Sequence, residues 1–555
     1  MDTKRTILWA VFSIAGLLLY NNWLAYEGKS PIFGPQTTAK QNETTPNQDK
    51  KNDVPTATAG NNSAPPSVLN KTLPATVAQA ANKERFKLQN DVLAIDISAD
   101  GANVIGATLL KELEVDKKPI ELLQVTPGHQ YLARSGLIAA GNVELPNHTS
   151  EFKLQSTGKD GSGRPYLVVI SERNGVSLEK TFILNPDSYV IDVMHRVSKT
   201  NPAVGPLVLY TELVRDGSKR EESQFYSTFT GPAVYTDKEK FTKIEFSDIE
   251  KNKISIPKQV AAGEPAWVAM VQHYYASAWI PSDKLARDIY AGKIDNNVYR
   301  VGIQTPLENV DLGKTTMETA RLFVGPQQES ALEVIAPGLE LLKDYGYLTI
   351  LAKPIFWTLE RIHEYINNWG WSIVVLTILI KLLFYPLSAA SYKSMARMKE
   401  VQPRIMAMRE ANKGNPQKMN QEMMALYKKE KINPLGGCLP MLIQIPVFIS
   451  LYWVLLSSVE IRNAPWILWI HDLAVPDPYY ILPIIMAVSM WVQTKLNPTP
   501  PDPIQAKVMM YMPIIFSIMF FFFPAGLVLY WVVNNILSIA QQWQINKMIM
   551  KKASK

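Results

Sequence analysis

Residues Trp371–Ala390 read WSIVVLTILIKLLFYPLSAA, an apolar stretch with one charged side chain, Lys381, near its middle. An α-helix needs about 20 predominantly apolar residues to cross a bilayer, and this stretch has that length. An ionised side chain at the centre of such a helix costs at least about 2.5–3.5 kcal/mol. Lys381 also lies too far from either end for its amine to reach the membrane surface easily. The stretch therefore predicts a membrane span whose lysine needs a special environment.

Other apolar segments extend this pattern along the chain. The C-terminal part holds four more, Pro434–Val459, Tyr479–Thr494, Val508–Phe523 and Leu527–Ile545, which with the first give a predicted five-helix core over residues 369–547. Near the N-terminus, Ile7–Leu24 follows Lys4 and Arg5. A cleaved signal peptide is the alternative there, but its apolar core is usually shorter. Residues 1–26 are therefore interpreted as an uncleaved anchor, which makes six transmembrane helices.

The charges of the loops orient these spans. The loop Ser391–Lys431 holds ten Lys or Arg against four Glu, and the short tail, residues 548–555, is also basic. The loop Glu460–Pro478 carries Arg462 and no lysine. Cytoplasmic loops are enriched in Lys and Arg, so the basic loops are assigned to the cytoplasm. This predicts a polytopic α-helical membrane protein with both termini inside (N-in/C-in).

Between the anchor and the core, the hydrophobic period changes from helix to strand. Residues 36–82 contain no aromatic residue and are rich in polar residues and proline, which is typical of a flexible linker. Over residues 83–330 apolar and polar side chains alternate, and Asn174-Gly175 between two β-rich runs is a strong hairpin signal. This region is predicted to be an all-β sandwich. The uncharged stretch Pro265–Ser282 could pass for a span, but its polar and tyrosine content favours buried strands.

Two further helical segments are predicted around the first span of the core. Residues 345–366 have an apolar face opposite charged side chains, which is typical of a helix in the membrane interface. A helix packed on the sandwich is the alternative. Residues 391–431 are predicted to form a cytoplasmic helical hairpin. It has adaptable methionines beside positive charges, which suits contact with varied apolar partners. The residues concerned are Met395, Met398, Met406, Met423, Arg404 and Arg409.

The surroundings of Lys381 suggest a polar cavity. The later spans hold no Asp or Glu except Glu460 at a rim, so an ion pair is disfavoured and a water-filled environment is predicted. Thr377 lies one turn earlier on the same face. Gln444 and Asn534 are candidate lining residues, although each could equally hydrogen-bond between helices.

The composition excludes several functional classes. The single cysteine, Cys438, rules out a disulfide framework and a cysteine-rich zinc site. There is no phosphate-binding loop, nucleophile elbow or zinc motif, and His195 falls on an apolar strand face. No catalytic residue, cofactor or metal is therefore predicted. The basic residues border apolar spans, so no sequence-specific nucleic-acid partner is expected either.

Several strings resemble the YidC membrane protein insertase family of the Gram-negative type. They are NPLGGCLP (433–440), LWIHDL (468–473), DPYYILP (477–483), FPAGLVLY (523–530) and, in the sandwich, WVAMVQHY (267–274). The resemblance implies an insertase and chaperone that inserts, folds and assembles newly synthesised integral membrane proteins in the inner membrane. It also implies a periplasmic β-supersandwich and a hydrophilic groove that is open to the cytoplasm and lipid and closed on the outside.

The same resemblance implies particular site residues and partners. Lys381 matches the positive residue of the groove, where many members carry arginine. Tyr530 matches a groove residue, and Trp531 stands where a second tyrosine is expected. The implied partners are nascent membrane proteins, the Sec translocon (SecYEG and SecDF), the ribosome with the signal recognition particle machinery, and membrane lipids. Two rival hypotheses are a secondary transporter that uses Lys381 and a periplasmic sugar-modifying enzyme.

Overall fold

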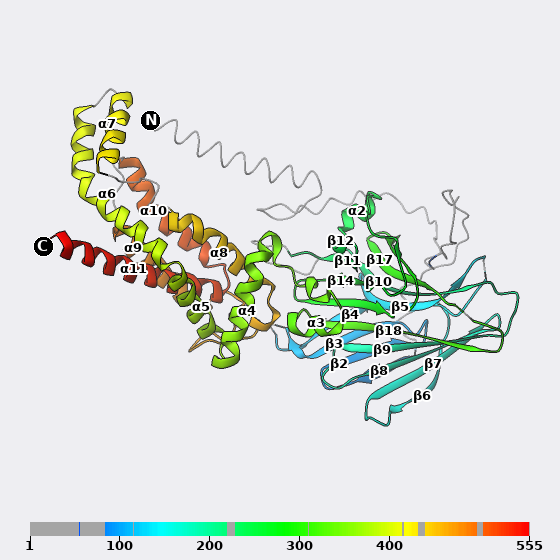
Figure 1. The fold of residues 1–555 in the computed structure, drawn as a ribbon. Coiled ribbons are helices and arrows are strands. Elements are labelled where there is room, and N and C mark those ends of the chain that lie inside the picture. Colours follow the sequence, from blue (N-terminus) through cyan, green and yellow to red (C-terminus); the bar gives the residue numbers. More distant parts are fainter. Residues whose placement is uncertain are drawn as a thin grey trace. The chain divides into compact units, whose positions relative to one another are not determined.

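The computed structural model describes residues 55, 84–114, 116–141, 143–218, 228–308, 310–412, 416–430, 439–496 and 503–553 (Figure 1). The predicted anchor 1–26, the linker 36–82 apart from Pro55, and the last two residues of the tail lie outside this set. The chain divides into two compact units, with the change from one to the other between Lys343 and Asp344. Each unit is described by itself below.

The first unit is built from two nine-stranded antiparallel sheets. One sheet has the order β1 (Arg85–Gln89), β2 (Leu93–Ser98), β3 (Val104–Leu113), β4 (Pro119–Thr126), β5 (His129–Ala139), β10 (Leu207–Asp216), β17 (Val298–Pro306), β16 (Arg287–Asp295) and β13 (Gln259–Val260). The other has the order β12 (Lys240–Lys243), β11 (Gly231–Thr236), β14 (Ala266–Val271), β15 (Tyr275–Pro281), β18 (Thr315–Pro326), β9 (Val190–Lys199), β8 (Val176–Leu184), β7 (Pro165–Arg173) and β6 (Lys153–Lys159). The unit also holds the short helices α2 (Phe246–Glu250), α3 (Glu329–Ile335) and η2 (Leu339–Leu342).

Two local predictions for this region are confirmed. Strands β7 and β8 pair across Asn174 and Gly175, whose φ angles of 49° and 72° are those of a type I′ turn. The uncharged stretch Pro265–Ser282 forms β14 and β15, in which every residue is buried. Its lack of charge is therefore explained by burial inside the sandwich.

His195 is confirmed as a packed histidine. It is fully buried on β9, and its Nε2 lies 2.9 Å from the Ser135 hydroxyl oxygen. Its register partner on β8 is Lys180, whose Nζ donates to the carbonyl oxygens of Gly101 and Ser135 at 2.6 and 2.9 Å. Burial lowers the pKa of Lys180 to about 7, and burial together with this neighbouring lysine lowers the pKa of His195 to about 3.

The second unit is helical. Its helices are η3 (Gly346–Leu348), α4 (Thr349–Ile366), α5 (Trp369–Leu383), α6 (Tyr385–Ala411), α7 (Pro416–Lys429), α8 (Leu439–Ser457), η5 (Val459–Ile461), α9 (Ile481–Leu496), α10 (Pro503–Phe520) and α11 (Ala525–Ala553). Among the described residues, no single helix is both long and apolar enough to cross a membrane. The bent pair α5–α6 meets these criteria of length and composition when its two helices are taken together. Shorter apolar helices cover Gln444–Ser457, Ile481–Leu496 and Met510–Phe520.

The predicted span Trp371–Ala390 is not one straight helix. It breaks at Phe384, where α5 and α6 meet at a bend of 66°. Pro386 in the first turn of α6 explains the break, because proline has no N–H to donate to the carbonyl four residues earlier and its ring clashes with that carbonyl. The first arm of the predicted hairpin is thus the continuation of α6, and α7 forms the second arm.

The predicted amphipathic helix corresponds to α4. Its residues Ala352, Phe356 and Leu359 are buried, and the helix packs on α5 and α8. Ile350, Trp357 and Tyr365 stay largely exposed. Packing inside the helical unit thus accounts for one apolar face, and the membrane interface is still the expectation for the exposed side chains.

Helices α9 and α11 run parallel to each other. Asn535 Nδ2 donates to Ser489 Oγ at 3.3 Å, and Gln542 Nε2 donates to Leu496 O at 3.4 Å. The two bonds advance by seven residues along both helices, from 535 to 542 and from 489 to 496. At the N-terminal end of α11, the amides of Ala525 and Gly526 donate to Val475 O and Leu473 O at 2.8 and 3.0 Å. We call this end of the bundle, formed by residues 460–480 and 524–526, the loop end.

Asp477 holds the loop end together. Its side chain accepts hydrogen bonds from Trp469 Nε1 at 3.0 Å, from Tyr479 N at 3.0 Å and from Leu482 N at 2.8 Å. Asp477 is only 1% exposed, so water could not easily replace its carboxylate as the acceptor for these three N–H groups. The carboxylate also lies at the N-terminus of α9, where negative charge is favourable.

We predict that Asp477→Ala destabilises the helical unit by about 2–3 kcal/mol, because it leaves buried donors without an acceptor. The measurement is thermal unfolding of the purified chain in detergent. Asp472→Ala is the matched control, since Asp472 lies in the same loop and accepts from the backbone N–H of Ala474, at 2.8 Å, and from that of Asn463, but is less buried. Equal midpoints for the wild type and Asp477→Ala would show that the network does not matter.

Candidate functional site

Lys381 is buried, but its partner is neutral. The residue is 7% exposed, and its Nζ donates to Ser538 Oγ on α11 at 2.7 Å. Within the part of the chain that the structure describes, Lys381 forms no ion pair, in agreement with the lack of acidic residues in these helices. An ammonium group has three donors, so two of them are left for other acceptors.

A polar stripe on α11 faces the lysine. Ser538 Oγ in turn donates to Asn534 O at 2.7 Å, and Asn534 Oδ1 accepts from Gln444 Nε2 on α8. Asn534, Ser538 and Gln542 are spaced four residues apart, so they lie on one face of the helix. All three are at most 6% exposed. Lys381, Ser538, Asn534 and Gln444 therefore form one hydrogen-bonded chain across three helices.

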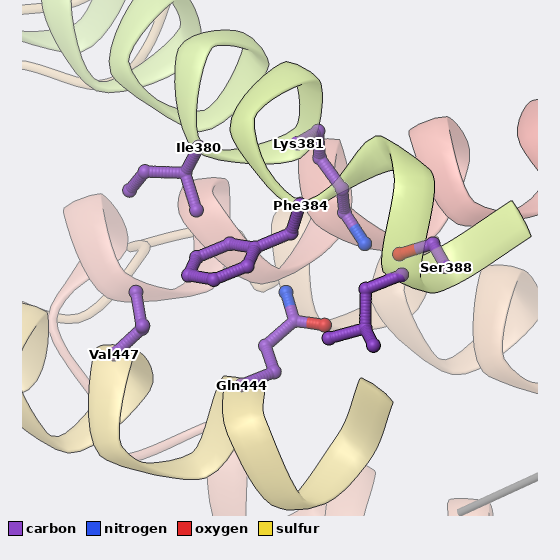
Figure 2. A pocket seen from close by; sticks show the side chains of 7 residues that line it. Ile380, Lys381, Phe384, Ser388, Gln444 and Val447 are labelled. Carbon is purple, nitrogen blue, oxygen red and sulfur yellow. The ribbon is translucent and has the colours of Figure 1, made fainter. Parts of the chain in front are cut away.

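A small cavity lies beside this chain. Its volume is about 20 Å³, which is room for about one water molecule. Figure 2 shows Lys381 and Phe384 entering it from one side and Gln444 and Val447 from the other. The lining residues are Ile380, Lys381, Phe384, Leu387, Ser388, Gln444 and Val447. The amine of Lys381 and the side chains of Ser388 and Gln444 supply the polar groups of this otherwise apolar, water-sized cavity.

The other predicted groove residues are Thr377, Tyr530 and Trp531. Thr377 is fully buried, but its hydroxyl donates to Ile373 O at 2.6 Å on its own helix, so it is not available to hydrate the cavity. Tyr530 is 1% exposed and Trp531 is half-buried, and both rings pack on Phe448. Among the described residues, neither the Tyr530 hydroxyl nor the Trp531 Nε1 completes a hydrogen bond.

The loop end packs closely on the start of α5. Asn368 caps α5 by accepting from Trp371 N at 3.0 Å, and its Nδ2 donates to Trp466 O at 3.1 Å. Gly370 lies directly under Trp466, where a Cβ atom would come within 2.2 Å of the indole. Only glycine leaves room for this close contact between α5 and the loop. Since α5 begins here, the bend at Phe384 and the hairpin lie toward the other end.

The hairpin residues divide into packed and exposed groups. Val401 and Ile405 are buried, and Met398 and Met423 pack against them, so these two methionines belong partly to the core of the hairpin. Met406 is 49% exposed, and Met395 is half-buried. Arg404 pairs with Glu430 at 2.8 Å. The side chain of Arg409 and the loop residues 413–415 lie outside the described set.

Sequence reasoning missed Ser538, the direct partner of Lys381. The signal was present, because Ser538 lies one helical turn after Asn534, which was identified as a lining residue. It was overlooked because a serine in an apolar helix commonly bonds its own backbone, as Ser538 also does here. Ser388 and Phe384 were missed for another reason. They reach the cavity only because the helix bends at Phe384.

Family models match both units of the chain. The YidC periplasmic domain model matches residues 85–358, and the 60Kd inner membrane protein model matches residues 361–553. The first description names a periplasmic domain and the second an inner membrane protein.

Curated relatives match along the full length. A membrane protein insertase YidC of Polynucleobacter necessarius subsp. necessarius is 67% identical over 100% of both chains. That of Cupriavidus necator is 56% identical over 99% of this chain and 98% of its own. The crystal structure of an active YidC insertase aligns with a TM-score of 0.38 and 16% identity over 83% of this chain and 92% of its own. The identity of the curated relatives over both units shows that this chain belongs to the YidC family of membrane protein insertases.

Proposed function

We propose that this chain inserts newly synthesised proteins into the inner membrane, as the names of its relatives state for them. Lys381 is the point at which a polar or acidic client segment is received. The observation that supports this role is the buried ammonium group with a hydroxyl as its only described side-chain partner and a water-sized cavity beside it. A charge kept in this state attracts carboxylates more strongly than one paired with a resident acid.

The partner of Lys381 also sets how tightly a client is held. A serine hydroxyl orients the amine without neutralising it, so an incoming carboxylate does not have to displace a resident one. Lysine is a flexible point charge with rotatable donors, unlike the rigid fork of arginine. Contact with a client carboxylate is therefore strong enough to lower the barrier to entry, and transient enough for the client to leave sideways into lipid.

We infer that the chain has six spans with both termini in the cytoplasm. The loop charges support this, and so does the parallel course of α9 and α11, which two spans separated by one further span must have. The loop end carries little positive charge and would face the periplasm, the compartment also proposed for the sandwich. The hairpin would then lie in the cytoplasm, where the ribosome, the signal recognition particle machinery and SecYEG are the proposed partners, with SecDF proposed for the sandwich.

We predict that Lys381→Arg retains insertion, while Lys381→Ala and Lys381→Glu slow the insertion of clients with acidic translocated tails by about tenfold or more. Loss of a charge-assisted interaction of about 1.5–3 kcal/mol gives an effect of this size. Clients with neutral tails should suffer less, because they need hydration more than charge. The measurement is an insertion assay on clients that differ only in tail charge, in cells that depend on each variant.

Two further variants separate the charge from its positioning. Ser538→Ala removes the partner of the amine and should reduce insertion of acidic-tailed clients partially, whereas Ser538→Thr keeps the hydroxyl and should restore it. Lys495→Ala, which removes an exposed lysine at the end of α9, is the matched control. Normal insertion of acidic-tailed clients by Lys381→Glu would exclude an electrostatic role.

The topology is tested by labelling single cysteines in intact cells after removal of Cys438. We expect a cysteine at Met406, which is exposed on the hairpin, to react only with a membrane-permeant maleimide. A cysteine at Pro476, in the loop end, should react with an impermeant one. Reaction of both positions with the impermeant reagent would contradict the six-span arrangement.

The hairpin is proposed to contact clients before they reach Lys381. A photocrosslinker at the exposed Met406 should trap nascent chains at early lengths, because an exposed methionine offers an adaptable apolar surface. The same group at Val401, which is 6% exposed, is the matched control and should trap few chains. Crosslinks from Met406 that form only with fully inserted clients would argue against a receiving role.

A further inference from the structure

A second cavity, of about 420 Å³, lies in the β-sandwich. Its lining includes Asp192, Trp267, Asp283, Arg287, Thr319 and Arg321. Trp279 on β15 donates its indole N–H to Glu212 O of the opposite sheet, so it faces inward and its neighbour Ile280 faces outward. Ile280, Arg321 and Asp192 are register partners on β15, β18 and β9. The cavity therefore opens on the outer face of the second sheet, and its volume is within the range of ligand pockets.

Arg321 is the first unusual group of this cavity. It is half-buried in a row between Ile280 and Asp192, yet no side-chain hydrogen bond or ion pair involves it within the described part of the chain. Its neighbour Asp192 accepts instead from Asn185 Nδ2 at 2.9 Å. A partly desolvated guanidinium group with five free N–H donors is well suited to bind a carboxylate, which accepts hydrogen bonds.

Arg287 is the second unusual group. It is 2% exposed, and its Nη1 and Nη2 donate to the carbonyl oxygens of Ser282, at 3.1 Å, and of Glu264. Its Nε is buried and has no partner among the described residues. Two carbonyl oxygens hold this guanidinium group at the wall of the cavity, and the carboxylates of Asp283, Glu318 and Glu264 interact electrostatically with it. The cavity thus contains two positive groups, neither of which is bound by a carboxylate in a described ion pair.

The rest of the lining narrows the class of ligand. Asp192 and Asp283 would repel a phosphate dianion. Trp267 is 1% exposed and stacks on Tyr235 with rings 5.5 Å apart and 8° from parallel, so it has no free face on which a sugar could stack. Ala266, Ile280 and Ala336 supply an apolar wall. The lining suits a ligand with one carboxylate, an apolar group and donors for the two aspartates, which is the chemistry of a short stretch of polypeptide.

We propose that this cavity binds an extended polypeptide segment that carries an acidic side chain next to an apolar one. The acidic side chain pairs with Arg321. The neighbouring apolar side chain lies on the wall of Ala266, Ile280 and Ala336. Backbone N–H groups of the segment donate to Asp192 and Asp283. This site is separate from the Lys381 cavity, and its existence does not depend on the insertion activity.

The test uses the full chain in detergent and a dye-labelled peptide, acetyl-Leu-Asp-Leu-amide, followed by fluorescence anisotropy. We expect saturable binding that weakens about tenfold or more when the peptide aspartate is replaced by asparagine, since the charge-assisted bond is lost. Arg321→Gln should weaken binding of the aspartate peptide by a similar factor. The side chain of Arg321 makes no described hydrogen bond, so this change should leave the fold intact. An unchanged unfolding midpoint would verify this.

Two matched variants and a second peptide complete the test. Arg196 lies on β9, the strand of Asp192, and pairs with Glu179 of β8. The Arg196→Gln variant should therefore bind the aspartate peptide normally. Thr319→Trp fills the cavity without changing its charge and should abolish binding. Acetyl-Leu-Ala-Leu, with a free C-terminal carboxylate, should bind more weakly. The proposal is overturned if the aspartate peptide shows no saturable binding, or if the asparagine peptide binds equally well. It is also overturned if Arg321→Gln binds the aspartate peptide normally, or if the peptide with the terminal carboxylate binds more tightly.

Discussion

The ammonium group of Lys381 is the constraint that the helical unit is arranged around. A charge in an apolar helix needs hydrogen-bond acceptors close by, and no acidic side chain in these helices supplies them. Ser538 on α11 provides one acceptor at 2.7 Å, and the cavity has room for water. Ser538 is in turn held by Asn534, which binds Gln444 of α8. The positions of α5, α8 and α11 are thus coupled through one polar chain that ends at the charge.

The loop end differs, because polar groups of the loop bond directly to the ends of the helices. Asp477 takes three donors, Asn368 bridges α5 to the loop, and the turn before α11 bonds the loop backbone. Close contact of Gly370 with Trp466 fills the remaining space. Each of these contacts ties the loop to α5, α9 or α11. The bundle therefore combines a tightly packed loop end with a buried lysine whose described partner is neutral.

The sandwich shows the same contrast on a larger scale. Lys180 and His195 are completely buried beside carbonyl and hydroxyl groups, and burial keeps the pKa of each well below its usual value. These groups stabilise and specify the space between the sheets. Arg321, on the outer face of the second sheet, differs, because its half-buried side chain has no described hydrogen-bond or ion-pair partner.

The sequence by itself determined the division into a β-rich and a helical part, the hairpin at Asn174-Gly175 and the buried strands of Pro265–Ser282, since these follow from local periodicity and turn chemistry. It also placed the charge of Lys381 in an apolar helix, where a charge is costly. Only the tertiary structure decided that Ser538 holds the amine, that Thr377 turns to its own backbone, and that Phe384 and Ser388 reach the cavity. It also brought Arg287 and Arg321 to one pocket from different sheets. These outcomes depend on helix rotation, on the bend before Pro386 and on strand register, which a linear pattern of residues does not contain.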